Sequence, residues 1–119
     1  MTLSQAYAKH PDHTITVEPH PGRVTVRVGD AVVAESGRAL VLREAGYPPV
    51  FYIPREDCRM ALFEPTDRVT HCPFKGDARY WTVAGVENAA WAYDAPFAQV
   101  ASIAGHVAFA GEAASIETG

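Results

Sequence analysis

Residues 68–81 read RVTHCPFKGDARYW, and no other part of the chain is as dense in reactive and aromatic side chains. The segment holds a Cys-Pro step at Cys72, a Lys-Gly step at Lys75, and two large aromatic residues, Tyr80 and Trp81. Because strand-like residues flank the Pro-Phe-Lys-Gly-Asp turn on both sides, we predict a hairpin here. Such a hairpin brings a thiol, an ammonium group and aromatic surface close together, although the segment contains no complete catalytic motif.

Alternating or continuous apolar runs of strand length follow one another along most of the chain, separated by turn-forming residues. Their order is dominated by hairpins, which predicts an all-β fold, mainly antiparallel, whose sheet is closed or folded over. The runs with strand character cover residues 14–17, 24–28, 31–36, 38–43, 49–53, 68–72, 78–83, 89–93 and 106–109.

One short helix is predicted over residues 54–63. Pro54 stands at the first helical position, Glu56 and Asp57 lie in the first turn, and Pro65 stops the helix. Cys58 falls within this segment, and we interpret it as a packing residue.

A Gly-Asp step at residues 29–30 is typical of a two-residue hairpin turn. The turn sets a register that places Val24 opposite Glu35, with Glu35 on the apolar face of the sheet. Two interpretations follow. Glu35 lies at the end of the sheet, where it reaches water, or it points inward and needs a cation, because an isolated buried charge is too costly. Lys75 or Arg43 could supply that cation.

The length of 119 residues suits one domain that removes roughly two-thirds of its unfolded surface from water. We assign residues 14–110 to this domain, residues 1–13 to an N-terminal arm or a short helix that ends before Pro11, and residues 111–119 to a loose tail. The hydrophobic content of 48% and the charged content of 20% are ordinary for a globular protein.

The net charge of −4 argues against a nucleic-acid binder, which needs a basic face. Nine of the ten Lys and Arg residues nevertheless lie between Arg23 and Arg79, so a small anionic ligand fits the composition. No apolar run approaches the roughly 20 residues that cross a bilayer. The start of the sequence shows no secretory leader, so we expect a reduced, cytoplasmic protein.

The histidines and cysteines do not predict a metal site. His10, His13 and His20 are separated by prolines and have no cysteine nearby, and Cys58 and Cys72 stand far apart in the sequence. We therefore expect no metal and no other cofactor.

Five segments carry a resemblance to a known family: VAES at Val33–Ser36, PPVFYIP with Asp57 at Pro48–Asp57, THCPFKGDARYW at Thr70–Trp81, AWAYD with Pro96 at Ala90–Pro96, and IAGHVAF at Ile103–Phe109. On these motifs the chain resembles a bacterial family known only as domain of unknown function 427. The matching segments span nearly the whole chain, and the Cys-Pro-Phe-Lys-Gly core is the most specific of them.

The resemblance implies a β-tent, the folded-sheet architecture of methionine sulfoxide reductase type B and the Mss-four protein. Those relatives bind zinc through paired Cys-x-x-Cys motifs, which this chain lacks, so the zinc site is not carried over. Members of the family are also labelled nucleotidyltransferase-like, yet the chain has neither a glycine-rich phosphate loop nor a paired Asp motif.

Cys72 is the sharpest catalytic candidate, because a nearby cation such as Lys75 stabilises a reactive thiolate. His71 is adjacent on the same strand and should face the other way, so it is a poor base for Cys72. The alternative is a small residue that only packs. Lys75 itself is either a turn lysine or the partner of Glu35, as a structural bridge or an acid/base couple.

Tyr52, Tyr80 and Trp81 are candidates for the walls of a pocket for a flat ligand, with Arg43 and His106 as further ligand-binding candidates. Core packing is the alternative for Trp81, and a satisfied core histidine is the alternative for His106.

The leading hypothesis is a domain that binds an unknown small molecule, with catalysis through Cys72 or through the Glu35/Lys75 couple as its extension. The alternative is a non-catalytic interaction domain in which residues 70–76 only shape the fold. An enzyme should show polar groups that converge in a pocket with a shifted pKa, whereas an interaction domain should show an exposed apolar patch and no cavity. Free strand edges could also pair two copies into a homodimer.

Overall fold

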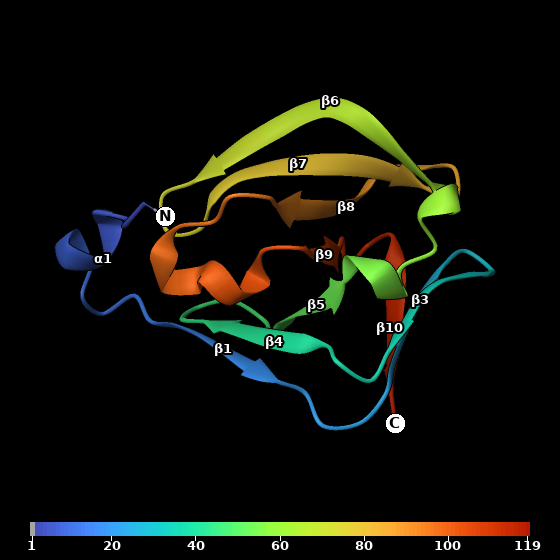
Figure 1. Ribbon diagram of the computed structural model, residues 1–119, viewed down its shortest axis with the longest axis horizontal. Coiled ribbons are helices and arrows are strands. Elements are labelled where there is room, and N and C mark those ends of the chain that lie inside the picture. Colours follow the sequence, from blue (N-terminus) through green and yellow to red (C-terminus); the bar gives the residue numbers. More distant parts are fainter. Residues whose placement is uncertain (1) are drawn as a thin grey trace.

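The computed structural model describes residues 2–119, which form ten strands in two sheets (Figure 1). The larger sheet has seven strands in the order β1-β4-β5-β9-β8-β7-β6, and the smaller has three in the order β10-β2-β3. The strands are β1 (Ile15–Pro19), β2 (Val24–Val28), β3 (Ala31–Ser36), β4 (Leu40–Glu44), β5 (Val50–Pro54), β6 (Phe63–Cys72), β7 (Gly76–Val83), β8 (Val86–Tyr93), β9 (His106–Phe109) and β10 (Ala114–Thr118).

The seven-stranded sheet folds over on itself. Figure 1 shows β6, β7 and β8 in one layer and β1, β4 and β5 in a second layer, with β9 joining them. The 3₁₀ segment η3 (Ala98–Ile103) lies between the layers on one side. Every strand pair described is antiparallel, which confirms the prediction of a mainly antiparallel, folded-over all-β domain.

The predicted helix over residues 54–63 is wrong. Two three-residue 3₁₀ turns stand there, η1 (Arg55–Asp57) and η2 (Met60–Leu62), on either side of an extended Cys58. Cys58 forms a β-bridge with Ala34 in β3, and the backbone N–H of Arg59 donates to the carbonyl oxygen of Val33 at 2.8 Å. Pairing with β3 therefore overrides a local pattern that favoured a helix. The α-helix that is present, α1 (Ala6–Lys9), lies in the N-terminal arm.

The tail is not loose as predicted. Residues 114–118 form β10, which pairs with β2 over its whole length and places Ile116 opposite Val26. Ala114 and Ile116 pack against the core on alternate positions. Two apolar residues in a short polar run are a weak strand pattern, and the free edge of β2 supplies the pairing that the pattern alone does not reveal.

The register predicted for the first hairpin holds only next to the turn. Val28 pairs with Ala31 as expected, but the register shifts after Arg27, and Glu35 then pairs with Thr25 instead of Val24. A β-bulge inserts one extra residue into β3 at this point. The bulge turns Glu35 away from the apolar face, so the inward-carboxylate interpretation is wrong.

The folded sheet has two apolar faces with different contents. We call the cluster between the two sheets the packed core; it includes Val24, Val26, Val33, Ile53, Trp81, Val83, Val107 and Phe109. We call the cluster inside the fold of the seven-stranded sheet the inner face; it includes Leu42, Tyr52, Ala78, Tyr93, Val100, Ile103 and Ala108. Because side chains alternate along a strand, neighbours such as Tyr52 and Ile53 belong to different faces.

None of the helices within residues 2–119 is long and apolar enough to span a membrane.

Candidate functional site

An ion pair between Lys75 and Glu44 stands at one end of the inner face. Lys75 lies in the turn between β6 and β7, and Glu44 is the last residue of β4. The Lys75 Nζ atom lies 2.6 Å from Glu44 Oε1, and the two side chains are only 12% and 11% exposed. A charged hydrogen bond shielded from water to this degree costs much more to break than a surface pair. The pair therefore anchors the turn to the opposite layer of the fold.

His13 is the second partner of Glu44. Its Nε2 atom lies 2.7 Å from Glu44 Oε2, and its ring stacks on Phe74 with centroids 4.0 Å apart. The pairing of β1 with β4 places Ile15 opposite Glu44, which brings His13 to this carboxylate. Burial opposes the charge of Glu44, but the hydrogen bonds from Lys75 and His13 outweigh it and hold the pKa of Glu44 below its ordinary value. Glu44 is therefore ionised at neutral pH.

Cys72 ends β6 and pairs with Gly76 across the hairpin. Its Sγ atom lies 3.9 Å from Lys75 Nζ, and its side chain is partly accessible. The other cysteine, Cys58, is buried, and its thiol donates to the carbonyl oxygen of Pro54 at 3.6 Å. Burial raises the pKa of Cys58 to about 12, which keeps it a thiol at neutral pH. The structure thus separates a packed cysteine from one that faces a charged group.

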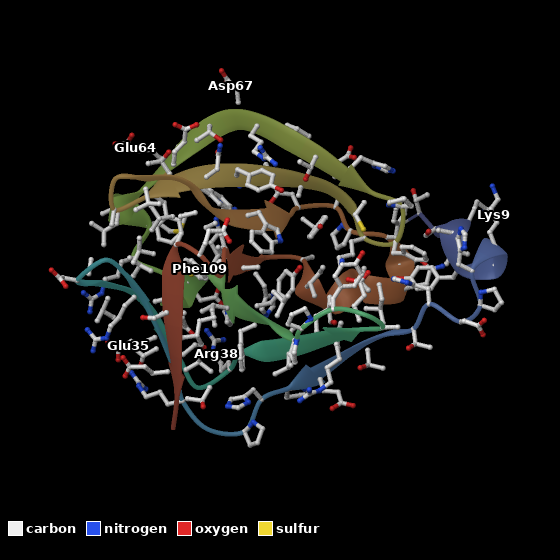
Figure 2. All side chains as sticks on the ribbon, turned by 180° about the vertical axis from the view of Figure 1, so that it is seen from behind. Lys9, Glu35, Arg38, Glu64, Asp67 and Phe109 are labelled. Atoms are coloured by element: carbon white, nitrogen blue, oxygen red, sulfur yellow. The ribbon has the colours of Figure 1, made fainter. Side chains whose placement is uncertain are left out.

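Next to Cys72 and Lys75 lie two adjoining cavities of about 550 Å³ and about 500 Å³. They share five lining residues, so we treat them as one space and call it the inner cavity. The shared residues are Leu42, Val50, Lys75, Trp91 and Gly111. Figure 2 shows side chains from both layers of the folded sheet that project into the region between them. A volume of this size and aromatic lining are typical of small-molecule sites.

Two tyrosines of the inner face line the first of these cavities. Tyr52 is 1% exposed and Tyr93 is 7% exposed, and both border the cavity. Burial raises the pKa of both phenols far above the ordinary value for tyrosine, so both hydroxyls stay protonated. Within residues 2–119, no side-chain hydrogen bond involves the Tyr93 hydroxyl. The hydroxyl is not sealed from solvent, since the buried polar side-chain atoms that lack a hydrogen-bond partner in this part of the chain are His20 Nε2 and Arg79 Nε. It is therefore open to a ligand or a water molecule in the cavity that Tyr93 lines.

The wall of the cavity nearest β6 is aromatic and cationic. The Tyr80 and Trp91 rings lie 6.3 Å apart on β7 and β8, which pair at these positions. Arg68 places its guanidinium carbon 4.9 Å from the centre of the Tyr80 ring, and the Tyr80 hydroxyl lies 2.9 Å from Thr70 Oγ1. These contacts hold Tyr80 in place and leave the Trp91 ring at the cavity.

Of the residues predicted for the site, the structure brings four to the inner cavity: Cys72, Lys75, Tyr52 and Tyr80. The hypothesis of a Glu35/Lys75 couple is wrong, because the Glu35 carboxylate lies 2.9 Å from Arg23 and 3.7 Å from Arg59.

The other three predicted residues lie away from the cavity. Trp81 is 2% exposed in the packed core, with Arg79 stacked over its ring at 4.4 Å. His106 places its Nδ1 atom 2.9 Å from the carbonyl oxygen of Ala104. Arg43 is exposed on β4 opposite Thr16. Trp81 therefore lies where the core-packing alternative predicted. His106 is half-buried and has a hydrogen-bond partner, as the alternative of a satisfied histidine predicted.

Sequence reasoning missed four residues of the site: His13, Glu44, Trp91 and Tyr93. A signal was present for the last two, because Trp91 and Tyr93 alternate with small alanines and must share one face of β8. Glu44 and His13 carry no local signal, since their meeting depends on the pairing of β1 with β4.

Charged residues outside the inner cavity pair with one another in the open. A groove of about 660 Å³ along β6 and β7 holds the exposed pair of His71 and Asp77, 2.7 Å apart, and the ion pair of Arg79 and Asp94. Across residues 2–119 no three His, Cys, Asp or Glu side chains gather as a metal ion would require.

Comparison with known proteins identifies the family and nothing finer. Residues 16–118 match the family described as a domain of unknown function, DUF427, so the chain belongs to that family. No curated protein matches the chain. The family match confirms the resemblance predicted from the Cys-Pro-Phe-Lys-Gly segment.

Proposed function

For this member of the DUF427 family, we propose that the inner cavity binds a small molecule with a flat, largely apolar body. The observation that carries the proposal is the convergence of Tyr52, Tyr80, Trp91 and Tyr93 on a space that Lys75 also borders. Aromatic walls hold a flat ring, and a few polar groups orient it.

The character of the cavity favours this function over an interaction domain. Polar groups converge in a cavity, and one of them, Glu44, has a shifted pKa, which are the signs expected of an enzyme and not of an interaction domain. The exposed large apolar side chains come from distant parts of the chain, among them Leu3, Tyr47 and Val69. Scattered apolar residues of this kind are normal on a protein surface.

The sheet edge at β6 gives little support to a homodimer. The edge strand β6 contains Pro65, and its pairing with β7 shifts register between Pro65 and Val69. Proline and irregular register are features that discourage pairing with a second chain. We therefore propose no second copy of the chain at this edge.

A fragment screen with a matched pair of variants tests the proposal. Val50 is half-buried and borders both parts of the cavity, so Val50→Trp should fill the space. Val69 is 66% exposed on the outer strand, so Val69→Trp adds the same side chain outside the cavity. Saturation-transfer NMR with a panel of flat aromatic fragments should detect binding to the wild type and to Val69→Trp, and not to Val50→Trp.

Both variants must first show a cooperative unfolding transition and the wild-type far-ultraviolet spectrum. Fragments that bind all three proteins equally would show that the cavity is not the binding site. A panel that binds none of the three would contradict the proposal directly.

A further inference from the structure

We propose that Cys72 is a nucleophile for the ligand of the inner cavity, and that this ligand is an α,β-unsaturated carbonyl compound with a flat apolar body. The inference rests on the proposed function, because it names the class of molecule that the same cavity takes.

The thiol stands where a bound molecule can reach it. Cys72 borders the cavity together with Val50, Lys75 and Trp91, and it packs against the inner face that holds Tyr52 and Tyr93. The Lys75 ammonium lies 3.9 Å from Cys72 Sγ, so a cationic donor stands beside the sulfur. The Glu44 carboxylate accepts from the same ammonium at 2.6 Å, which fixes Lys75 beside Cys72.

An independent observation points to an oxygen acceptor on the ligand. The Tyr93 side chain is more than nine-tenths buried, borders the cavity, and makes no side-chain hydrogen bond within residues 2–119. Its phenol stays protonated, so it can donate to an acceptor that enters the cavity. A carbonyl oxygen is such an acceptor, and it becomes a stronger one when it gains negative charge.

The reaction that joins these parts is a conjugate addition. The Cys72 thiolate attacks the β-carbon, a C–S bond forms, and the C=C π bond breaks. The electron pair moves to the carbonyl oxygen, where the enolate receives a hydrogen bond from a phenol such as Tyr93. The α-carbon then takes a proton from solvent, equal to the one that the thiol released. No oxidant, leaving group or co-reactant is required.

A thiol of this type suits that class of ligand. Thiolates are soft nucleophiles that attack at polarisable carbon, and the donors of the inner face can stabilise the enolate. Cys58 provides the contrast, because it is buried in the packed core with its thiol bonded to the Pro54 carbonyl oxygen.

The test uses 4-phenylbut-3-en-2-one, a flat aromatic enone, on the full chain at neutral pH. Loss of the enone absorbance gives the rate, and peptide mass mapping gives the position. We expect Cys72 to react at least about tenfold faster in the folded protein than in the urea-unfolded chain, and Cys58 to stay unmodified until unfolding. Cys72→Ser should abolish the adduct.

The variant Tyr93→Phe tests whether Cys72 reacts with help from the Tyr93 hydroxyl or reacts only because its thiol is accessible. The variant keeps the ring and removes the hydroxyl, so the enone rate should fall by about tenfold or more. Iodoacetamide, which alkylates thiols without forming an enolate, should react with Cys72 at nearly the same rate in wild type and Tyr93→Phe. Equal enone rates in the two proteins would overturn the proposed role of the phenol, and an enone rate no greater than in the unfolded chain would overturn the inference as a whole.

The saturated analogue 4-phenylbutan-2-one is the control that distinguishes a failure of the covalent step from a failure of small-molecule binding. It has the same shape and carbonyl group but no electrophilic carbon. The analogue could bind the wild type and not Val50→Trp while the enone leaves Cys72 unmodified. In that case the proposed binding function stands and the covalent step is wrong. If neither compound interacts with the folded protein, the ligand class proposed here is wrong.

Discussion

The packed core and the inner face share strands β5, β7, β8 and β9, but their side chains differ in kind. The packed core also draws on β2 and β3 of the smaller sheet. In the packed core Val24, Val26, Val33 and Val83 are fully buried, and aliphatic or aromatic side chains fill the space between the sheets. The inner face instead presents phenols, a thiol and a buried ion pair beside open volume.

The alternation of side chains along each strand creates this division. Tyr80 faces the cavity and Trp81 the core, and Tyr52 and Ile53 divide in the same way. The core face is filled by apolar side chains, whereas the inner face borders open volume, and our proposal assigns that volume to a ligand. The comparison predicts that substitutions in the core cost stability, and that those on the inner face chiefly cost function.

The two tryptophans give the largest expected contrast. Trp81→Ala removes a side chain that is 2% exposed and packs against Phe63, and should lower the free energy of unfolding by about 3–5 kcal/mol. Trp91→Ala removes a half-buried ring beside open space and should cost less than half as much. Urea unfolding of both variants measures the difference. Equal losses would contradict the division into a packed core and a binding face.

Lys75→Met asks whether the ion pair of the inner face is as important to stability as core packing. The variant leaves the Glu44 carboxylate with His13 as its remaining partner, and should lower the free energy of unfolding at pH 7 by about 2–4 kcal/mol. Adding Glu44→Gln to Lys75→Met should recover part of the loss, because the unpaired charge is gone. A double variant less stable than the single one would show that the pair does not act through charge.

The same ion pair should also make the free energy of unfolding depend on pH, and we expect this effect to be smaller than that of Lys75→Met. Because the pKa of Glu44 is lower in the folded state than in the unfolded chain, its contribution is fully present above the ordinary carboxyl pKa of about 4.3 and is lost as the pH falls through the folded value. The unfolding free energy of Glu44→Gln should therefore fall less between pH 6 and pH 3 than that of the wild type. Parallel curves for the two proteins would rule out this contribution.

Glu35→Gln should have the smallest effect. The Glu35 side chain is 37% exposed, and its partner Arg23 is 64% exposed, so the pair contributes at most about 1 kcal/mol. Thermal unfolding at low and high salt checks this. A loss of several kcal/mol would instead support the interpretation that Glu35 points inward, which the bulge in β3 contradicts.

Local patterns predicted the elements better than the pairings between them. The hairpin of residues 68–81 and the alternation of β2 and β8 are local, and the structure confirms them. The first strand of that hairpin is longer than predicted, because β6 begins at Phe63 and pairs with β7 from there. The helix over residues 54–63 failed because the bridge from Cys58 to Ala34 is a long-range contact. The prediction of a loose tail was wrong for the same reason, because β10 forms by pairing with the distant strand β2.

The site shows the same limit. Cys72, Lys75, Tyr52 and Tyr80 were found because reactive or aromatic residues stand near a turn or on a strand. The partner of Lys75 was assigned wrongly, because one extra residue in β3 reverses which face Glu35 occupies. The sequence does not predict that Glu44 is the partner of Lys75, because this contact depends on the end of β4 lying beside the turn between β6 and β7.

The central claim is that one face of the folded sheet binds a small molecule and the other does not. The chain has two tryptophans, and each reports on one face: Trp91 on the inner cavity and Trp81 on the packed core. A titration of ¹⁵N-labelled protein with 4-phenylbutan-2-one, followed through the two indole N–H signals, measures both at once. Our account predicts a saturable shift of the Trp91 signal while the Trp81 signal stays in place. A shift confined to Trp81, or equal shifts of both signals, would contradict it.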